Sequence, residues 1–418
     1  MNILWITNIL LPPIAEALNQ TKFNFGGWML SSANQLKVID GVNLTIASVS
    51  NCDNIIKKTI EGIDYYVLPN EKYCNSDKSL GDYWQQVREE VNPEVVHIHG
   101  TEFSHGLAYI KSCGNDNVVV SIQGMISVIS RFYTGGMTVR DIKRNITLAD
   151  LAFGGIKKSV ENHRVRGEVE VAYLNNVKHV IGRTSWDKVH CWALNPRCSY
   201  HFCNETLRPS FFNACWDINK ICRHTIFLSS KASSLKAADM VLKALPLVLR
   251  AYPDTKIRIC GNNPISNTSF KSKILLSGYN KYFSRLVEKL KLHSHVEYLG
   301  TLTEKEMVSA FLNAHVFICP SSIENSPNSL GEAQLVGTPA IGSYVGGIPD
   351  MIEHKKTGFL YRFEEVEMLA NYICNIFADD NLALSLSKES RKIANQRHSP
   401  QNNTEKLLEI YKQILISN

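Results

Sequence analysis

The sequence lacks any apolar run of about eighteen residues, which excludes an ordinary membrane-spanning helix. It also has little charge imbalance: 45 Lys and Arg against 39 Asp and Glu give a net charge of +6, which does not indicate nucleic-acid binding. The eleven Cys are odd in number and scattered, as expected of free thiols in a reducing compartment. With 44% apolar and 20% charged residues, disorder, collagen and coiled coil are excluded, and we expect a globular cytoplasmic protein.

Short apolar runs alternate with helical stretches along nearly the whole chain, and most runs are continuous rather than alternating. Continuous runs are typical of parallel strands that helices cover on both faces. The predicted strands are residues 3–6, 44–48, 95–98, 118–122, 179–181, 225–228, 256–259, 296–299, 316–318 and 339–341. The repeated strand–helix order predicts the α/β class with doubly wound, Rossmann-like sheets.

A length of 418 residues favours two domains, and the pattern of strands and helices breaks at residues 206–222. We therefore predict an N-terminal Rossmann-like domain at 1–205, a linker at 206–222 and a C-terminal Rossmann-like domain at 223–396. Residues 397–418 form a final helix that we expect to pack back on the N-terminal domain. Two such domains would face each other across a cleft at the carboxyl ends of their strands, where ligands bind.

The strongest local signal follows the predicted strand 316–318, in the run PSSIENSPNSLGEA at residues 320–333. Pro327 suits the approach to a helix that begins near Asn328 or Ser329, and unpaired amides at such a helix start can hold a phosphate. Glu332, one turn further on, could accept hydrogen bonds from the two hydroxyls of a ribose. Alternatively, Ser329 and Glu332 form a capping box and serve only to begin the helix.

Glu324 and Glu332 are separated by seven residues, and AQLVGTPAIG, VGGIPD and KTGFL follow at residues 333–342, 345–350 and 356–360. This order and spacing resembles the second domain of the family-4 retaining glycosyltransferases. The resemblance implies the GT-B fold, with a nucleotide-sugar donor on the C-terminal domain and the acceptor on the N-terminal one. It also implies a bacterial setting such as the biosynthesis of capsule, lipopolysaccharide or another polysaccharide.

Carried onto this chain, the resemblance assigns Glu332 to the ribose hydroxyls and Glu324 to the donor sugar. The amides of three residues at the helix start would hold the pyrophosphate: Asn328, Ser329 and Leu330. Backbone groups around Gly300 would read the nucleotide base.

A second donor-side segment, SSKASSLKA at residues 229–237, follows the predicted strand 225–228. Lys236 matches the cation that the family places beside the leaving diphosphate, where positive charge stabilises the transition state. Ala237 stands where the family has Gly, and Ser230 where it has Arg. Lys231 could supply the missing charge, or it could be a solvated side chain at a helix start.

In the N-terminal half, Gly26 and Gly27 follow the first strand and its loop, and they resemble the family's glycine loop near the donor phosphate. His99 and Glu102 follow the predicted strand 95–98 and are candidates for the acceptor side. Gln123 stands where many relatives carry His near the donor sugar; it can hydrogen-bond a hydroxyl but cannot titrate.

The chain contains no Asp-x-Asp sequence, the divalent-metal clamp of the other large glycosyltransferase fold, so we expect no metal and no cofactor. We predict a retaining, metal-independent hexosyltransferase that uses a UDP-sugar or GDP-sugar and a glycan or lipid-linked glycan acceptor. Residues 138–192 hold ten Lys and Arg against six Asp and Glu, which would suit peripheral contact with an anionic membrane. The alternatives are a sugar-nucleotide epimerase of the same fold and a catalytically degenerate binding subunit.

Overall fold

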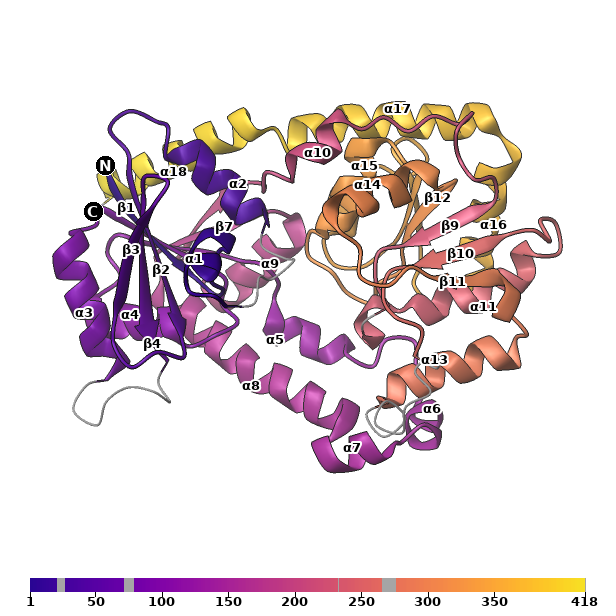
Figure 1. Cartoon of the computed structure of the whole chain (residues 1–418), viewed down its shortest axis with the longest axis horizontal. Helices are drawn as coiled ribbons and strands as arrows, with labels where there is room; N and C mark the ends of the chain where they lie inside the picture. Colours follow the sequence, from indigo (N-terminus) through magenta and orange to yellow (C-terminus); the bar gives the residue numbers. More distant parts are fainter. Residues whose placement is uncertain (21–26, 71–78, 232, 265–275, 418) are drawn as a thin grey trace. The chain divides into compact units, whose positions relative to one another are not determined.

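A computed structural model describes residues 1–20, 27–70, 79–231, 233–264 and 276–417. The chain divides into two compact units, coloured along the sequence in Figure 1. Unit 1 combines Met1–Ser127, Arg164–Arg208 and Arg397–Asn418, and unit 2 combines Val128–His163 with Pro209–Gln396.

Unit 1 is built on a sheet of eight strands in the described residues, in the order β3-β4-β2-β1-β5-β6-β7-β8. Neighbouring strands pair in parallel except β3 and β4, which form an antiparallel hairpin. That hairpin turns at Glu61 and Gly62, both at positive φ (48° and 81°), the backbone that a tight two-residue turn requires. The strands are β1 Asn2–Thr7, β2 Asn43–Ser50, β3 Ile56–Ile60, β4 Ile63–Pro69, β5 Val95–His99, β6 Val118–Ser121, β7 His179–Gly182 and β8 Ser199–Phe202.

Helices of unit 1 pack on this sheet, and the last helix of the chain belongs to its core. Leu407, Ile410 and Ile414 of α18 (Pro400–Ser417) are buried in the cluster that contains Trp5 of β1. Tyr411 on the same helix accepts a hydrogen bond from Trp5 Nε1 at 2.9 Å. The other helices are α1 Pro12–Ala17, α2 Gly27–Leu36, α3 Leu80–Val91, α4 His105–Cys113 and α9 Ser185–Leu194; α5 Ile126–Ile129 and α8 Gly155–Asn176 each cross between the units.

Unit 2 is built on a parallel sheet of six strands in the described residues, in the order β11-β10-β9-β12-β13-β14. Its strands are β9 Thr225–Leu228, β10 Lys256–Ile259, β11 Val296–Tyr298, β12 Val316–Cys319, β13 Ala340–Ser343 and β14 Phe359–Tyr361. Its main helices are α10 Pro209–Asn213, α11 Ala238–Val248, α13 Gly278–Lys289, α14 Glu304–Asn313, α15 Asn328–Val336, α16 Val366–Ala378 and α17 Asp380–Arg397.

The division into units differs from the sequence prediction in one long segment. Val128–His163, which holds α6 (Val139–Arg144) and α7 (Leu148–Phe153), groups with unit 2 although it falls inside the predicted domain 1–205. Its polar atoms explain this grouping, because Ser322 Oγ donates to Phe132 O at 3.1 Å and Gly278 N donates to Asp150 Oδ1 at 3.2 Å.

The predicted linker 206–222 also differs from the structure. It contains α10, and Phe211 and Trp216 are buried in unit 2. The chain therefore passes from unit 1 to unit 2 at Arg208, and the rest of the segment packs within unit 2.

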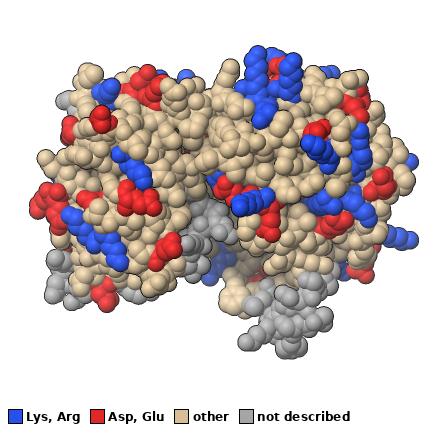
Figure 2. Space-filling model, turned by 45° about the horizontal axis from the view of Figure 1, so that its top comes forward, with Lys and Arg blue, Asp and Glu red and all other residues tan. Residues whose placement is uncertain are grey.

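The α/β class is confirmed, and all ten predicted strands are present, two of them with the predicted bounds and the others with ends shifted by at most two residues. Four strands were not predicted: β3, β4, β8 and β14. No helix among the described residues is long and apolar enough to cross a membrane, and no cluster of three metal-ligating side chains occurs among them. On the face visible in Figure 2, Lys and Arg side chains are mixed with Asp and Glu side chains.

Candidate functional site

Lys236 and Glu324, which lie 88 residues apart in the sequence, form an ion pair in unit 2. Lys236 ends the short turn Ser234–Lys236 after β9, and Glu324 lies in the loop after β12. Because β9 and β12 are adjacent parallel strands, the loops that follow them meet at the same edge of the sheet. The attraction of Glu324 raises the pKa of Lys236, so the ammonium is charged at neutral pH. Its side chain is 41% exposed, which leaves it accessible to a ligand.

Three further contacts fix the position of Glu324. Ser321 Oγ donates to Glu324 Oε1 at 3.0 Å, and Gly347 N donates to the Glu324 carbonyl at 2.9 Å. Gly346 has φ +52°, and a Cβ atom there would lie 1.8 Å from the Glu324 carbonyl oxygen. Gly346 therefore lets the two loops pass at a distance that a residue with a Cβ atom would not allow.

Helix α15 begins directly after this loop, with Pro327 as its N-cap and no side-chain cap among the described residues. Asn328 and Ser329 lie in its first turn and are half-buried. The capping-box alternative is wrong, because Ser329 lies inside the helix and Pro327 offers no side-chain acceptor. Leu330 N already donates to Pro327 O at 3.0 Å. Of the three predicted amides, those of Asn328 and Ser329 are left to suit an anion, together with the partial positive charge of the helix start.

Glu332 lies one turn into α15 and is buried, with 6% of its surface exposed, between Leu330 and Ala333, which are fully buried. The carboxylate stands within the first turns of the helix whose start suits a phosphate. Its position agrees with the predicted ribose contact, which stays a prediction.

Lys231 is almost fully buried rather than solvated. Its Nζ lies 3.4 Å from Asn280 Oδ1 and 5.8 Å and 5.7 Å from the ring centroids of Phe283 and Tyr298. Burial lowers the pKa of Lys231. These contacts hold the ammonium beside aromatic faces, and its role toward the donor stays a prediction.

Two donor-side positions have left-handed backbone. Ala237, which stands where the family has Gly, has φ +45° and ψ 38° and is fully buried. Gly300 has φ +70° and pairs with Gly261 across an isolated bridge, in which Gly261 N donates to Gly300 O at 2.8 Å. An alanine in this conformation is strained by about 1–2 kcal/mol, so position 237 has a backbone that favours glycine although it carries alanine.

In unit 1, His99 and Gln123 line one small cavity of about 40 Å³, together with Trp5 and Trp28. His99 is 3% exposed and stacks on His97 with ring centroids 3.8 Å apart. Neither ring nitrogen of His99 has a hydrogen-bond partner among the described residues. Burial lowers the pKa of His99 to about 3, so the ring is neutral and can take one hydroxyl or water as a partner.

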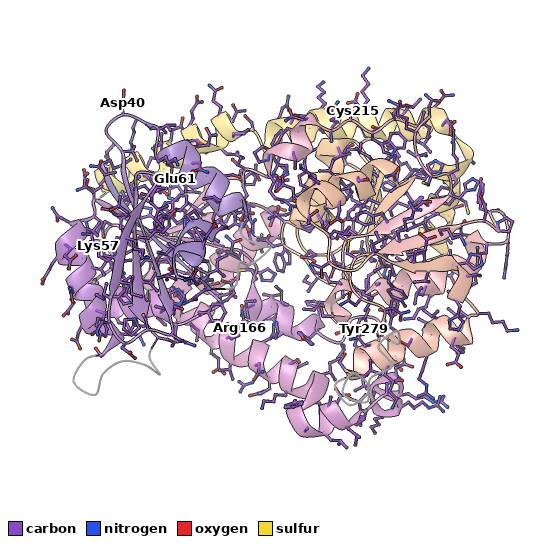
Figure 3. All side chains as sticks on the ribbon, in the orientation of Figure 1. Asp40, Lys57, Glu61, Arg166, Cys215 and Tyr279 are labelled. Atoms are coloured by element: carbon purple, nitrogen blue, oxygen red, sulfur yellow. The ribbon has the colours of Figure 1, made fainter. Side chains whose placement is uncertain are left out.

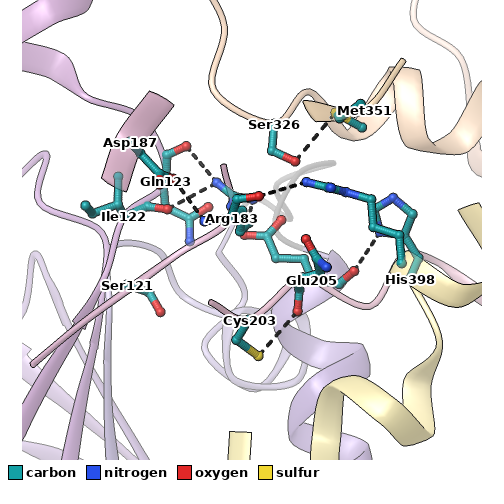
Figure 4. Close-up of polar contacts among 12 residues, drawn as sticks. Ser121, Ile122, Gln123, Arg183, Asp187, Cys203, Glu205, Ser326, Met351 and His398 are labelled. Atoms are coloured by element: carbon teal, nitrogen blue, oxygen red, sulfur yellow. Dashed lines mark hydrogen bonds and ion pairs between the residues drawn. The ribbon is translucent and has the colours of Figure 1, made fainter. Parts of the chain in front are cut away.

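Sequence reasoning did not identify Arg183 and Glu205, which border the same cavity and are shown in Figure 4. Arg183 Nη1 lies 2.6 Å from Glu205 Oε1, both side chains being less than 10% exposed, and Arg183 Nη2 donates to the Gln123 carbonyl at 2.7 Å. This buried pair fixes the backbone of Gln123. Arg183 directly follows β7, so the rule that selected His99 after β5 would have found it.

The remaining predicted residues lie elsewhere. Glu102 accepts a hydrogen bond from Asn8 Nδ2 at 2.5 Å, burial raises its pKa, and it does not line the cavity of His99 in the described chain. Gly27 begins α2, where a Cβ atom would lie 3.3 Å from Arg208 Cδ. Gly26 lies outside the described residues.

The family model for glycosyl transferases group 1 matches residues 222–393. Among curated relatives, D-inositol 3-phosphate glycosyltransferase of Corynebacterium urealyticum is 27% identical over 182 residues, which are 43% of this chain and 41% of the relative. The Bacillus subtilis protein YtcC is 23% identical over 372 residues, 85% of this chain and 81% of the relative. Several relatives are thus matched over less than half of their own length.

Solved structures share the whole fold at low identity. Sucrose-phosphate synthase of Thermosynechococcus elongatus aligns over 100% of both chains, with a TM-score of 0.73 and 13% identity. HepE of Anabaena, solved in complex with UDP and glucose, aligns over 99% of both chains, with a TM-score of 0.66 and 14% identity. The chain therefore has the GT-B fold, and its residues 222–393, less than half of the chain, match the family model for glycosyl transferases group 1.

Proposed function

We propose that this chain is a retaining, metal-independent glycosyltransferase. It transfers a hexosyl group from a UDP-sugar or GDP-sugar to a hydroxyl of a glycan or lipid-linked glycan. The observation that carries the proposal is the ion pair of Lys236 and Glu324 beside the uncapped start of α15. The likeness to HepE, a protein solved with UDP and glucose, supports a nucleotide-sugar donor.

The donor diphosphate would bind where positive charge gathers, at the ammonium of Lys236 and the first amides of α15. Negative charge grows on the diphosphate as its bond to the sugar breaks. Lys236 and the helix start therefore stabilise the transition state more than the ground state, and they do so without a metal ion. The acceptor hydroxyl attacks from the face that the diphosphate leaves, and a phosphate oxygen takes its proton.

Glu324 has two tasks in this scheme. Before the donor binds, it pairs with Lys236 and keeps that side chain extended toward the loop. Once phosphate oxygens of the donor pair with the Lys236 ammonium, the Glu324 carboxylate is free to turn toward the sugar ring. There it can orient hydroxyls and stabilise the positive charge that develops on the ring. Gly347 holds the backbone of Glu324 in place during the exchange.

Bacterial polysaccharide synthesis at the cytoplasmic face of a membrane is the setting that we propose. The excess of Lys and Arg at residues 138–192 supports peripheral contact with anionic lipid there. This setting would bring a lipid-linked acceptor within reach of the enzyme.

The test incubates the protein with UDP-glucose or GDP-mannose, with and without lipid-linked glycans extracted from a polysaccharide-producing bacterium, and measures nucleoside diphosphate release. We expect release that depends on the acceptor and falls in Glu324→Gln. Interconversion of the donor sugar without acceptor would favour the epimerase instead. Tight nucleotide binding with no turnover, unchanged by Glu324→Gln, would favour a binding subunit.

A further inference from the structure

Unit 2 contains a pocket of about 530 Å³ that the proposed reaction does not use. Its walls come from α6, α7 and the first turns of α8, together with the start of α13 and the loop after β9. Figure 1 shows α6 and α7 beside α13, and Tyr279 of α13, labelled in Figure 3, is one of the lining residues. The volume is that of an ordinary small-molecule site.

Several polar groups in the wall already bond within the protein. Asp150 accepts hydrogen bonds from Gly278 N at 3.2 Å and Thr147 N at 3.0 Å. Ser159 Oγ donates to Gly155 O at 3.1 Å, and Ser234 Oγ donates to the carbonyl of Tyr133. A sugar or peptide would find few unused partners here, whereas a hydrocarbon chain requires none.

The mouth of the pocket is apolar and exposed. Ile146, Leu151 and Phe153 line it and are 46%, 73% and 66% exposed. Lys157 also lines it, and Val128–His163 as a whole holds six Lys and Arg against three Asp and Glu. Exposed apolar side chains at the mouth would admit a hydrocarbon chain, and the excess of basic residues in this segment favours a chain that belongs to an anionic lipid.

The inner end of the pocket reaches Ser233 and Ser234, the residues that lead into Lys236. A chain held there would therefore have its head close to the cation that we assign to the leaving diphosphate. We propose that this pocket binds the acyl or prenyl chain of an anionic, lipid-linked acceptor. The inference rests on the proposed function and names the acceptor class within it.

The test measures calorimetric binding of hexyl, octyl and decyl phosphate below their micelle concentrations, with inorganic phosphate as the head-group control. If methylene groups enter the pocket, affinity rises about fourfold for each one buried. Ala149→Trp, at a buried wall position, should remove this dependence on chain length, and Leu151→Asp at the exposed mouth should weaken it. Leu384→Asp is the matched control, because Leu384 is 45% exposed on α17 and lies outside the wall.

Affinity that does not depend on chain length, or that both pocket variants leave unchanged, overturns the inference. Binding to phosphatidylglycerol vesicles without binding of the monomeric alkyl phosphates overturns it in favour of a membrane surface contact. If the protein self-associates, Leu151→Asp abolishes this self-association and no alkyl phosphate binds, the inference is overturned in favour of a second copy of this chain covering the pocket mouth. UDP and GDP binding is measured in the same samples: its absence beside intact alkyl binding would refute the proposed function and leave the pocket assignment standing.

Discussion

Gly346→Ala tests whether the loop after β13 holds the Glu324 loop in place. The new Cβ atom would lie 1.8 Å from the Glu324 carbonyl oxygen, and position 346 has φ +52°. The backbone strain of a left-handed alanine is about 1–2 kcal/mol, and displacing a packed neighbour adds about 1–3 kcal/mol. We therefore expect unit 2 to lose about 3 kcal/mol, a fall in melting temperature of about 6–12 °C for a domain of this size.

Differential scanning calorimetry measures this fall, with Gly41→Ala as the matched control. Gly41 has φ +77° with nothing within 4 Å of its added Cβ, so it carries the backbone strain without the collision. Gly41→Ala should lower the melting temperature only slightly, since alanine also restricts the unfolded chain. If the Gly346→Ala protein has the melting temperature of the wild type or of the Gly41→Ala protein, the account of how Glu324 is positioned is refuted.

Further predictions concern the cation and the buried histidines. Lys236→Met should lower kcat about 10²–10³-fold and Lys236→Arg less, measured as diphosphate release; equal rates in both variants would remove Lys236 from the mechanism. Burial lowers the pKa of His99 and His398 to about 3 and of His105 to about 4, all in unit 1. Below about pH 6.5 these His bind protons in the unfolded chain but not in the folded unit. Each His therefore lowers the free energy of unfolding by about 1.4 kcal/mol for each pH unit as the pH falls toward 4. Calorimetry from pH 7 to 4.5 should show a steep loss of stability in unit 1, and a flat profile would contradict it.

The sequence predicted most strands because continuous apolar runs mark them, as in β1, β5, β6 and β12, which are almost fully buried. It missed β3 (IKKTI) and β8 (SYHF), whose polar and charged side chains follow from their places at the two edges of the sheet. It missed β4 although its residues are mostly buried, because Asp64 and two tyrosines interrupt the apolar run. An edge strand is defined by its neighbour rather than by its own composition.

The sequence marked candidate residues in the donor-side loops but not the contacts between them. The motif at residues 320–333 marked Glu324, and the segment 229–237 marked Lys236, yet nothing in either segment shows that the two side chains pair. That pairing follows from the order of β9 and β12 in the sheet. The grouping of Val128–His163 with unit 2 could not be predicted from the sequence either. It depends on hydrogen bonds such as that from Gly278 to Asp150, which lie 128 residues apart.

The most direct test of the central claim is nucleotide binding at the start of α15. Isothermal calorimetry would compare UDP and GDP on the wild type, on Glu332→Ala and on Glu353→Ala, a surface control whose partner is the nearby Lys356. We predict that one nucleotide binds the wild type and the control alike and binds Glu332→Ala about tenfold or more weakly, because a hydrogen-bonded carboxylate is lost. Binding that is unchanged in Glu332→Ala, or no binding of either nucleotide at millimolar concentration, would contradict the donor site.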